Sequence, residues 1–147
     1  MTDVQASEER LATETLQGEY EHVLDFQVRD YECDLQGIVN NAVYQNYLEH
    51  ARHQFLIEKG LDFVALSAQG INLVVIRVEI DYKSPLRAGD LFWLGSRLKK
   101  ISRLKFVFEQ SIYRSEKNVS IINAKVTGTS MNNAGRPVRF KGFDLIE

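Results

Sequence analysis

The sequence contains little of what several protein classes require. It has one cysteine, Cys33, and three histidines, which excludes a disulfide framework and a cysteine-rich metal site. Its longest apolar run, from Ile71 to Ile76, is interrupted by Asn72 and is far shorter than the ~20 residues that cross a bilayer. The formal net charge of −2 is not that of a polyanion-binding protein. We therefore expect neither a membrane span nor nucleic acid binding.

The first residues are polar and acidic. Five glutamates oppose one arginine before residue 22, which is typical of a mobile tail, with a short helix over residues 7–16 capped by Ser7 as the alternative. The segment lacks the apolar stretch of an export or organelle signal, and a lone thiol is compatible with a reducing compartment. We expect a flexible acidic tail over residues 1–21, a single domain over residues 22–147, and a cytoplasmic protein.

The rest of the chain has ordinary globular composition and one strong helical pattern. Of all 147 residues, 44% are hydrophobic and 26% charged, which fits one domain with a proper core. Apolar residues recur at helical spacing from Val43 to Leu56, and polar residues lie mostly between them. Asn40 or Asn41 can cap the start, and Gly60 can end the helix. This predicts one long amphipathic helix of nearly twenty residues.

Strand patterns surround this helix in the sequence. Residues 23–29 precede it, and alternating patterns follow over 74–82, 91–101, 104–112 and 119–131, with 136–140 expected to complete the sheet. Pro85 and Gly89 mark one turn between strands. Because the connections after residue 82 are too short for parallel crossovers, these strands are expected to be antiparallel. The order predicts an α+β domain whose curved sheet wraps around one central helix.

Specific residues strengthen this interpretation. The stretch from Val28 to Arg52, with Asp34 three positions before Gly37 and about six before the helix, resembles the hotdog-fold acyl-thioester hydrolases. The similarity is to the 4-hydroxybenzoyl-CoA thioesterase type and to plant acyl-lipid (acyl-ACP) thioesterases. A proline-containing turn ending in Gly89–Asp90 and a Gly-Arg-Pro run near the C-terminus match more weakly. The resemblance implies a hotdog fold of about five or six strands, assembled as a homodimer or homotetramer with active sites between subunits.

The resemblance also implies roles for the residues around the helix start. Asp34 is the expected general base or nucleophile, and the backbone N–H of Asn41 the expected oxyanion donor, because the first N–H groups of a helix lack intrahelical partners. Several relatives have a histidine where this chain has Asn41, so an acid–base role of that side chain is not implied. The expected substrate-binding residues of this region are Gly37, Val39, Asn40 and Tyr44.

Other candidate groups have simpler interpretations. Glu49 is a second carboxylate, and another branch of hotdog hydrolases uses a helical acid, but an ion pair with Arg52 or His53 is favoured. His50 and His53 lack a third metal ligand, and Cys33 lacks a recognisable histidine partner, which favours packing. No Gly-x-Ser-x-Gly motif and no glycine-rich phosphate loop is present. We therefore expect no metal and no redox cofactor.

A run of basic residues occupies the end of the predicted strand 91–101 and the residues that follow it. Arg97, Lys99, Lys100, Arg103 and Lys105 occur with no acid among them. The run is either a solvated edge strand protected by lysines or a binding site for coenzyme A phosphates or an acidic carrier protein. The charge pattern alone favours neither interpretation over the other.

The leading functional hypothesis is hydrolysis of an acyl thioester of coenzyme A or acyl carrier protein. The first alternative is a non-catalytic acyl-ligand sensor or binding module on the same fold, because a fold does not fix a function. The second is a hotdog hydratase or dehydratase. That chemistry depends on a catalytic histidine, and neither His50 nor His53 is where the resemblance places the reacting group.

Overall fold

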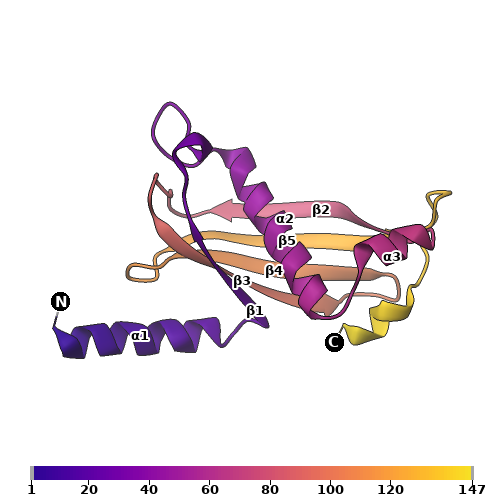
Figure 1. Ribbon diagram of the computed structural model, residues 1–147, viewed down its shortest axis with the longest axis horizontal. Coiled ribbons are helices and arrows are strands. Elements are labelled where there is room, and N and C mark those ends of the chain that lie inside the picture. The colour runs from indigo at the N-terminus through magenta and orange to yellow at the C-terminus, as the bar shows by residue number, and fades with distance from the viewer. Residues whose placement is uncertain (1, 147) are drawn as a thin grey trace.

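The computed structural model describes residues 2–146 and has an α+β architecture built on one antiparallel sheet (Figure 1). The strand order is β1-β3-β4-β5-β2, and every pairing is antiparallel. The strands are β1 (His22–Gln27), β2 (Asn72–Tyr82), β3 (Leu91–Lys100), β4 (Lys105–Arg114) and β5 (Ser120–Met131). The predicted fold class and the five main strand regions are therefore confirmed.

Helix α2 (Asn41–Glu58) crosses the concave face of this sheet (Figure 1). Its buried residues form one stripe, consisting of Tyr44, Tyr47, Leu48, Ala51, Phe55 and Leu56. Asn40 is the N-cap, and its side chain accepts a hydrogen bond from Ala42 N. At the other end Gly60 adopts a φ of +85°, which a non-glycine residue rarely adopts. The long central helix predicted from periodicity is confirmed, with one of its two proposed caps.

The C-terminal region differs from the expectation. Residues 136–140 do not form a strand: one isolated bridge joins Pro137 to Met131, and Val138 N donates to Ser130 O. Proline has no N–H to continue the ladder, which limits pairing at this point. The chain then enters the 3₁₀ helix η2 (Lys141–Leu145).

A short helix that periodicity did not indicate follows α2. Helix α3 (Phe63–Ala68) begins after Asp62, whose carboxylate accepts hydrogen bonds from Val64 N and Ala65 N. An aspartate before a short apolar segment was the only local signal of this helix. Helix α3 packs beside β2 at the end of the sheet where α2 stops (Figure 1).

The N-terminal segment, expected as a tail, contains helix α1 (Asp3–Gln17). It starts four residues before Ser7, because Thr2 and Gln5 form a capping box. None of its residues is buried, and it projects to one side of the sheet (Figure 1). Its contacts with the domain include Glu9 Oε1, which accepts from Lys117 N at 2.8 Å. The domain boundary placed at residue 22 coincides with the start of β1 and stays a prediction.

The two sheet edges are β1 and β2. Strand β1 pairs with β3 only from Leu91 to Ser96, so the basic residues 97–100 pair with β4 alone among the described strands. This end of β3 is a local edge, which is compatible with the edge-strand interpretation of the basic run. The β2 edge carries exposed apolar side chains, namely Val75, Ile76, Val78 and Tyr82, with Val75 at 50% exposure. An apolar edge of this kind is a surface that association can cover.

No helix within residues 2–146 is long and apolar enough to span a membrane.

Candidate active site

The segment between β1 and α2 forms a small loop closed by backbone hydrogen bonds. After the 3₁₀ helix η1 (Asp30–Glu32), an antiparallel bridge joins Cys33 to Val39. Asp34 N donates to Ile38 O at 2.9 Å, and Gly37 N donates to Asp34 O at 3.0 Å. Gly37 has a φ of +79°, so its lack of a side chain is what permits this tight turn.

The Asp34 carboxylate lies at the turn of this loop. Its Oδ1 accepts hydrogen bonds from Gln36 N at 2.9 Å and from Ile38 N at 3.4 Å. The side chain is exposed, and Oδ2 has no protein donor among residues 2–146. One oxygen therefore fixes the orientation of the group, and the other is available to a water molecule or an electrophile.

The loop ends at the N-terminus of α2. Asn40 Oδ1 accepts from Ala42 N at 3.0 Å, and Asn40 O accepts from Val43 N. The Asn41 N–H has no acceptor in the part of the chain that the structure describes. An unsatisfied N–H at the positive end of a helix is suited to a developing negative charge on a carbonyl oxygen.

A buried set of contacts holds this loop against the sheet. Val39 N donates to Leu86 O at 2.9 Å, and Leu86 N donates to the hydroxyl of Tyr44 at 3.3 Å. All three side chains are buried, and burial raises the pKa of the Tyr44 phenol. The structure thus places Val39 and Tyr44 in the supporting core, whereas Gly37 and Asn40 are exposed beside Asp34.

A cavity of about 320 Å³ lies between α2 and the sheet. Its helix side is formed by residues at helical spacing, Gln45, Glu49, Arg52, His53 and Leu56. The opposite wall is apolar and comes mainly from β2, β4 and β5. Sequence reasoning did not single out Arg52 or these strand residues as a cavity lining, because their convergence depends on how α2 crosses the sheet. Asp34 itself does not line the cavity.

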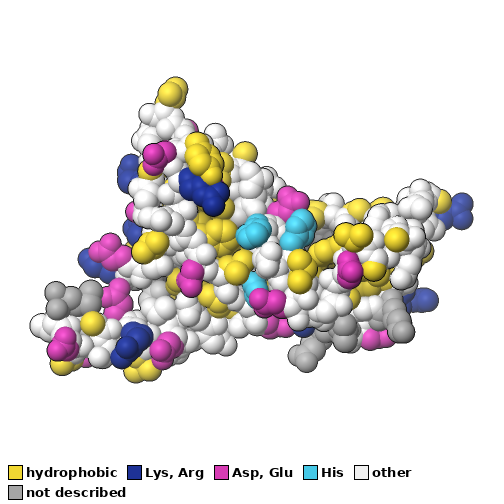
Figure 2. Space-filling view, viewed as in Figure 1, with side chains coloured by type: hydrophobic (Ala, Val, Ile, Leu, Met, Phe, Trp, Pro, Cys, Tyr) yellow, Lys and Arg dark blue, Asp and Glu magenta, His cyan; other side chains and the backbone are white. Residues whose placement is uncertain are grey.

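The titratable groups on the exposed side of α2 have modest contacts. Glu49 Oε1 lies 3.8 Å from His53 Nε2, and both side chains are more than half exposed. This is one of the two ion pairs that helical spacing favoured. His50 instead lies edge-on to Phe26. No cluster of three or more metal-ligating side chains occurs in the described part of the chain. On the face shown in Figure 2, histidine side chains lie among hydrophobic ones over α2.

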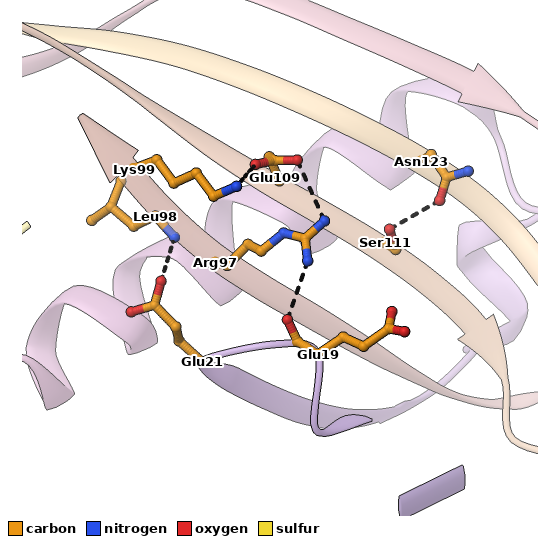
Figure 3. A network of polar contacts seen from close by, with 8 residues as sticks. All are labelled: Glu19, Glu21, Arg97, Leu98, Lys99, Glu109, Ser111 and Asn123. Atoms are coloured by element: carbon orange, nitrogen blue, oxygen red, sulfur yellow. Dashed lines mark hydrogen bonds and ion pairs between the residues drawn. The ribbon is translucent and has the colours of Figure 1, made fainter. Parts of the chain in front are cut away.

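The basic run is not brought next to Asp34. The side chains of Arg97 and Lys99 project from the outer face of the sheet and share one carboxylate, Glu109 (Figure 3), at 3.5 and 3.1 Å. Partial burial works against the charged form, but the Lys99 hydrogen bond and the Arg97 charge hold the pKa of Glu109 below its usual range. Lys100 lies 3.8 Å from Asp144, and Arg103 is exposed in the β3–β4 connection.

Comparison with known proteins places these features in context. Residues 28–143 match the family described as the Thioesterase-like superfamily. The acyl-acyl carrier protein thioesterase ATL2 of Arabidopsis thaliana, named as chloroplastic, is 38% identical over 118 residues, covering 80% of this chain and 63% of the plant protein. The long-chain acyl-CoA thioesterase FadM of Escherichia coli is 31% identical over 100 residues, which cover 68% of this chain and 75% of FadM. This chain therefore spans under two thirds of the plant relative.

Solved structures agree with the sequence relatives. A probable thioesterase from Bartonella henselae superposes with a TM-score of 0.73 at 27% identity, covering 81% of this chain and 98% of that one. A hypothetical protein from Aquifex aeolicus gives a TM-score of 0.77 at 25% identity over 86% of this chain and 99% of that one. The family match includes the Asp34 loop, α2 and all strands from β2 to β5. On its sequence and its fold, this chain belongs to the Thioesterase-like superfamily.

Proposed function

We propose that the protein hydrolyses acyl thioesters of coenzyme A or acyl carrier protein to the free acid and thiol. The observation that carries this proposal is an exposed, oriented carboxylate on the same short loop as an unbonded helix N–H. A thioester needs a base or nucleophile at its carbonyl carbon and a donor for the oxyanion. Asp34 and Asn41 provide these two groups in a chain of thioesterase ancestry.

Two routes use these groups. In the first, Asp34 takes a proton from water, the oxygen of that water attacks the carbonyl carbon, and the proton passes to the departing thiolate. In the second, a carboxylate oxygen of Asp34 attacks, the C–S bond breaks, and water hydrolyses the resulting anhydride. In both, the Asn41 N–H stabilises the oxyanion, with Gly37 and Asn40 beside the thioester. Neither route uses a metal or a redox cofactor.

The test is a panel of acyl-CoA and acyl-carrier-protein thioesters incubated with purified protein while free thiol is measured. We expect turnover with at least one carrier, as the names of the plant and bacterial relatives suggest. Binding of acyl ligands without turnover supports a binding module instead. Addition of water to an enoyl thioester supports the hydratase alternative.

We also propose a homodimer or homotetramer in which subunits meet at the apolar β2 edge. Light scattering should give a mass at least twice the 16.9 kDa of one chain. Ile76→Lys should shift the protein toward monomer, because a lysine on an edge strand opposes edge-to-edge pairing. Ile101→Lys, which changes an exposed apolar residue in the β3–β4 connection, is the control. A wild-type monomer at micromolar concentration contradicts the assembly.

The basic run is proposed to receive carrier phosphates or an acidic carrier protein. Because Glu109 already neutralises part of the Arg97 and Lys99 charge and Asp144 lies 3.8 Å from Lys100, the effect should come mainly from Arg103. Replacing Lys99, Lys100 and Arg103 together with glutamine should raise KM much more than it lowers kcat. An unchanged KM for both carriers leaves the run a solvated surface. Replacing Lys83, Lys117 and Arg136 with glutamine controls for the change in net charge.

The site of action is proposed to be the cytoplasm, because the lone cysteine, Cys33, is compatible with a reducing compartment. The plant relatives are named as chloroplastic. Fractionation of cells that express the tagged full chain distinguishes the two compartments.

A further inference from the structure

The cavity along α2 contains one cationic side chain that the proposed chemistry does not use. Arg52 lies on the cavity side of the helix, and its guanidinium carbon is 6.0 Å from the centre of the Phe108 ring. The apolar wall around it consists of Leu56, Phe63, Leu73, Val74, Val75, Val78, Phe106, Phe108 and Val126. A cation in such surroundings requires strong hydrogen-bond acceptors, because it has lost part of its hydration.

The protein gives Arg52 one neutral acceptor. Arg52 Nη1 donates to Gln110 Oε1 at 3.2 Å, and Gln110 is only 1% exposed. The Gln110 amide cannot reverse freely, because its Nε2 donates to Leu48 O and to Ser96 Oγ. Its oxygen is therefore fixed toward Arg52. A guanidinium has five N–H donors, and no other acceptor for them occurs within residues 2–146.

No carboxylate within the described chain balances this charge at close range. The nearest acid on the same face is Glu49, which is more than half exposed and is paired with His53. Glu49 is not within ion-pair distance of Arg52, although its charge is felt there. Burial lowers the pKa of the Arg52 guanidinium, but its ordinary value is so high that the group stays cationic at neutral pH. The cavity therefore has one partly buried cation at Arg52, an apolar wall opposite the helix, and the polar side chains of Gln45, Glu49 and His53 along its helix side.

The position of this charge relative to the reacting groups is set by the helix. Arg52 follows Asn41 by 11 residues, which corresponds to about 16 Å along the axis. The cavity lining begins at Gln45, one turn after Asn41. An acyl chain that starts at Asn41 and follows α2 would therefore reach Arg52 with its distal part rather than with its thioester.

We propose that Arg52 is a specificity-determining residue and that the cavity accepts an acyl chain whose far end carries a carboxylate. The substrate class is the mono-thioester of a dicarboxylic acid, with the free carboxylate bound by the unused N–H groups of Arg52. An arginine binds a carboxylate through two parallel hydrogen bonds, and the apolar wall covers the intervening methylene groups. This inference rests on the proposed function, which it deepens by naming the acyl group.

The first experiment compares matched substrates. Each ω-carboxyacyl-CoA is assayed beside the methyl-ended acyl-CoA of equal chain length, in the wild type and in Arg52→Met. We expect the ratio of the two kcat/KM values to fall about 10- to 100-fold in the variant, as the loss of charged hydrogen bonds predicts. Arg52→Lys keeps the charge without the paired donors and should give an intermediate ratio. If Arg52→Met does not fold, the ratio measured with Arg52→Lys tests the proposal by itself.

The second experiment measures binding without turnover. Calorimetry with the monomethyl ester of a long-chain dicarboxylic acid, which has one free carboxylate, and with the dimethyl ester, which has none, is carried out on the wild type and on both variants. We expect tighter binding of the monomethyl ester in the wild type and loss of this preference in Arg52→Met. If this result appears while no thioester is hydrolysed, the cavity assignment stands and the proposed enzymatic function fails.

Two results overturn the inference. One is that the wild type shows the same kcat/KM and the same affinity for the ligand with a free terminal carboxylate as for its matched control. The other is an unchanged substrate ratio in folded Arg52→Met or Arg52→Lys protein. If the oligomeric state of these variants also shifts, the cavity is assigned to a contact with a second copy of the chain.

Discussion

Asp34→Asn should fold, assemble and bind substrate, yet have a kcat at least ~100-fold below that of the wild type. Asparagine Oδ1 can still accept the hydrogen bonds that Gln36 N and Ile38 N now donate to the carboxylate, so the loop keeps its shape. The amide can act neither as an effective base nor as a carboxylate nucleophile. Steady-state kinetics on one thioester measures the loss of kcat. Melting temperature and light scattering, measured in parallel, check that the variant folds and assembles.

Glu49→Gln is the matched control, because it also neutralises an exposed acid near the proposed site. Its pair with His53 is surface-exposed, and such pairs contribute about 0–1 kcal/mol, so the variant should lose little stability and little turnover. Glu49 lines the cavity, which makes the reverse result informative. If Asp34→Asn stays active and a folded Glu49→Gln is inactive, the base is the helical acid.

Leu48→Ala should lower the stability of the protein by roughly 2–5 kcal/mol. Leu48 is 0% exposed at the centre of α2, where it packs in the cluster that includes Phe92 and Ile122 from the sheet. Removing its side chain leaves a cavity that rigid strands cannot fill. The melting temperature should fall by about 5–15 °C, measured at equal protein concentration because assembly affects the transition.

Ile57→Ala provides the comparison on the same helix. Ile57 is 57% exposed, so its truncation removes little buried area and should change the melting temperature by a few degrees at most. Equal effects of the two substitutions would contradict the placement of α2 with Leu48 toward the sheet. If assembly covers Ile57, its effect will depend on protein concentration, whereas the Leu48 effect will not.

The sequence predicted those elements whose information is local. The helical spacing from Val43 to Leu56 and the two-residue alternation of the later strands each follow from which side chains must leave water. The Asp34 loop was also located in the sequence, through the spacing to Gly37 and the helix start. Its positive-φ glycine and its capping asparagine are local requirements of the backbone, which is why a short motif suffices to mark them.

Other features were missed or predicted only in part although local signals existed. A short helix over residues 7–16 was the alternative to an acidic tail, and α1 is longer because the Thr2–Gln5 capping box starts it at Asp3. Helix α3 depends on the single cap Asp62 in a segment too short for periodicity to register. Residues 136–140 were predicted to complete the sheet, but Pro137 has no ladder donor, and the segment contacts β5 through one isolated bridge and a few backbone hydrogen bonds without forming a strand.

By itself, the sequence determined the α+β class, the central helix, the succession of strands along the chain and the loop that carries Asp34, whereas the strand order within the sheet, β1-β3-β4-β5-β2, depends on tertiary structure. Only the tertiary structure decided that β3 is an interior strand, that Arg97 and Lys99 share Glu109 across the outer face, and that Arg52 meets Gln110 beside an apolar cavity. The physical reason is separation along the chain. Arg52 and Gln110 are 58 residues apart, and hydrophobic periodicity states which face is buried but not which distant side chain it meets.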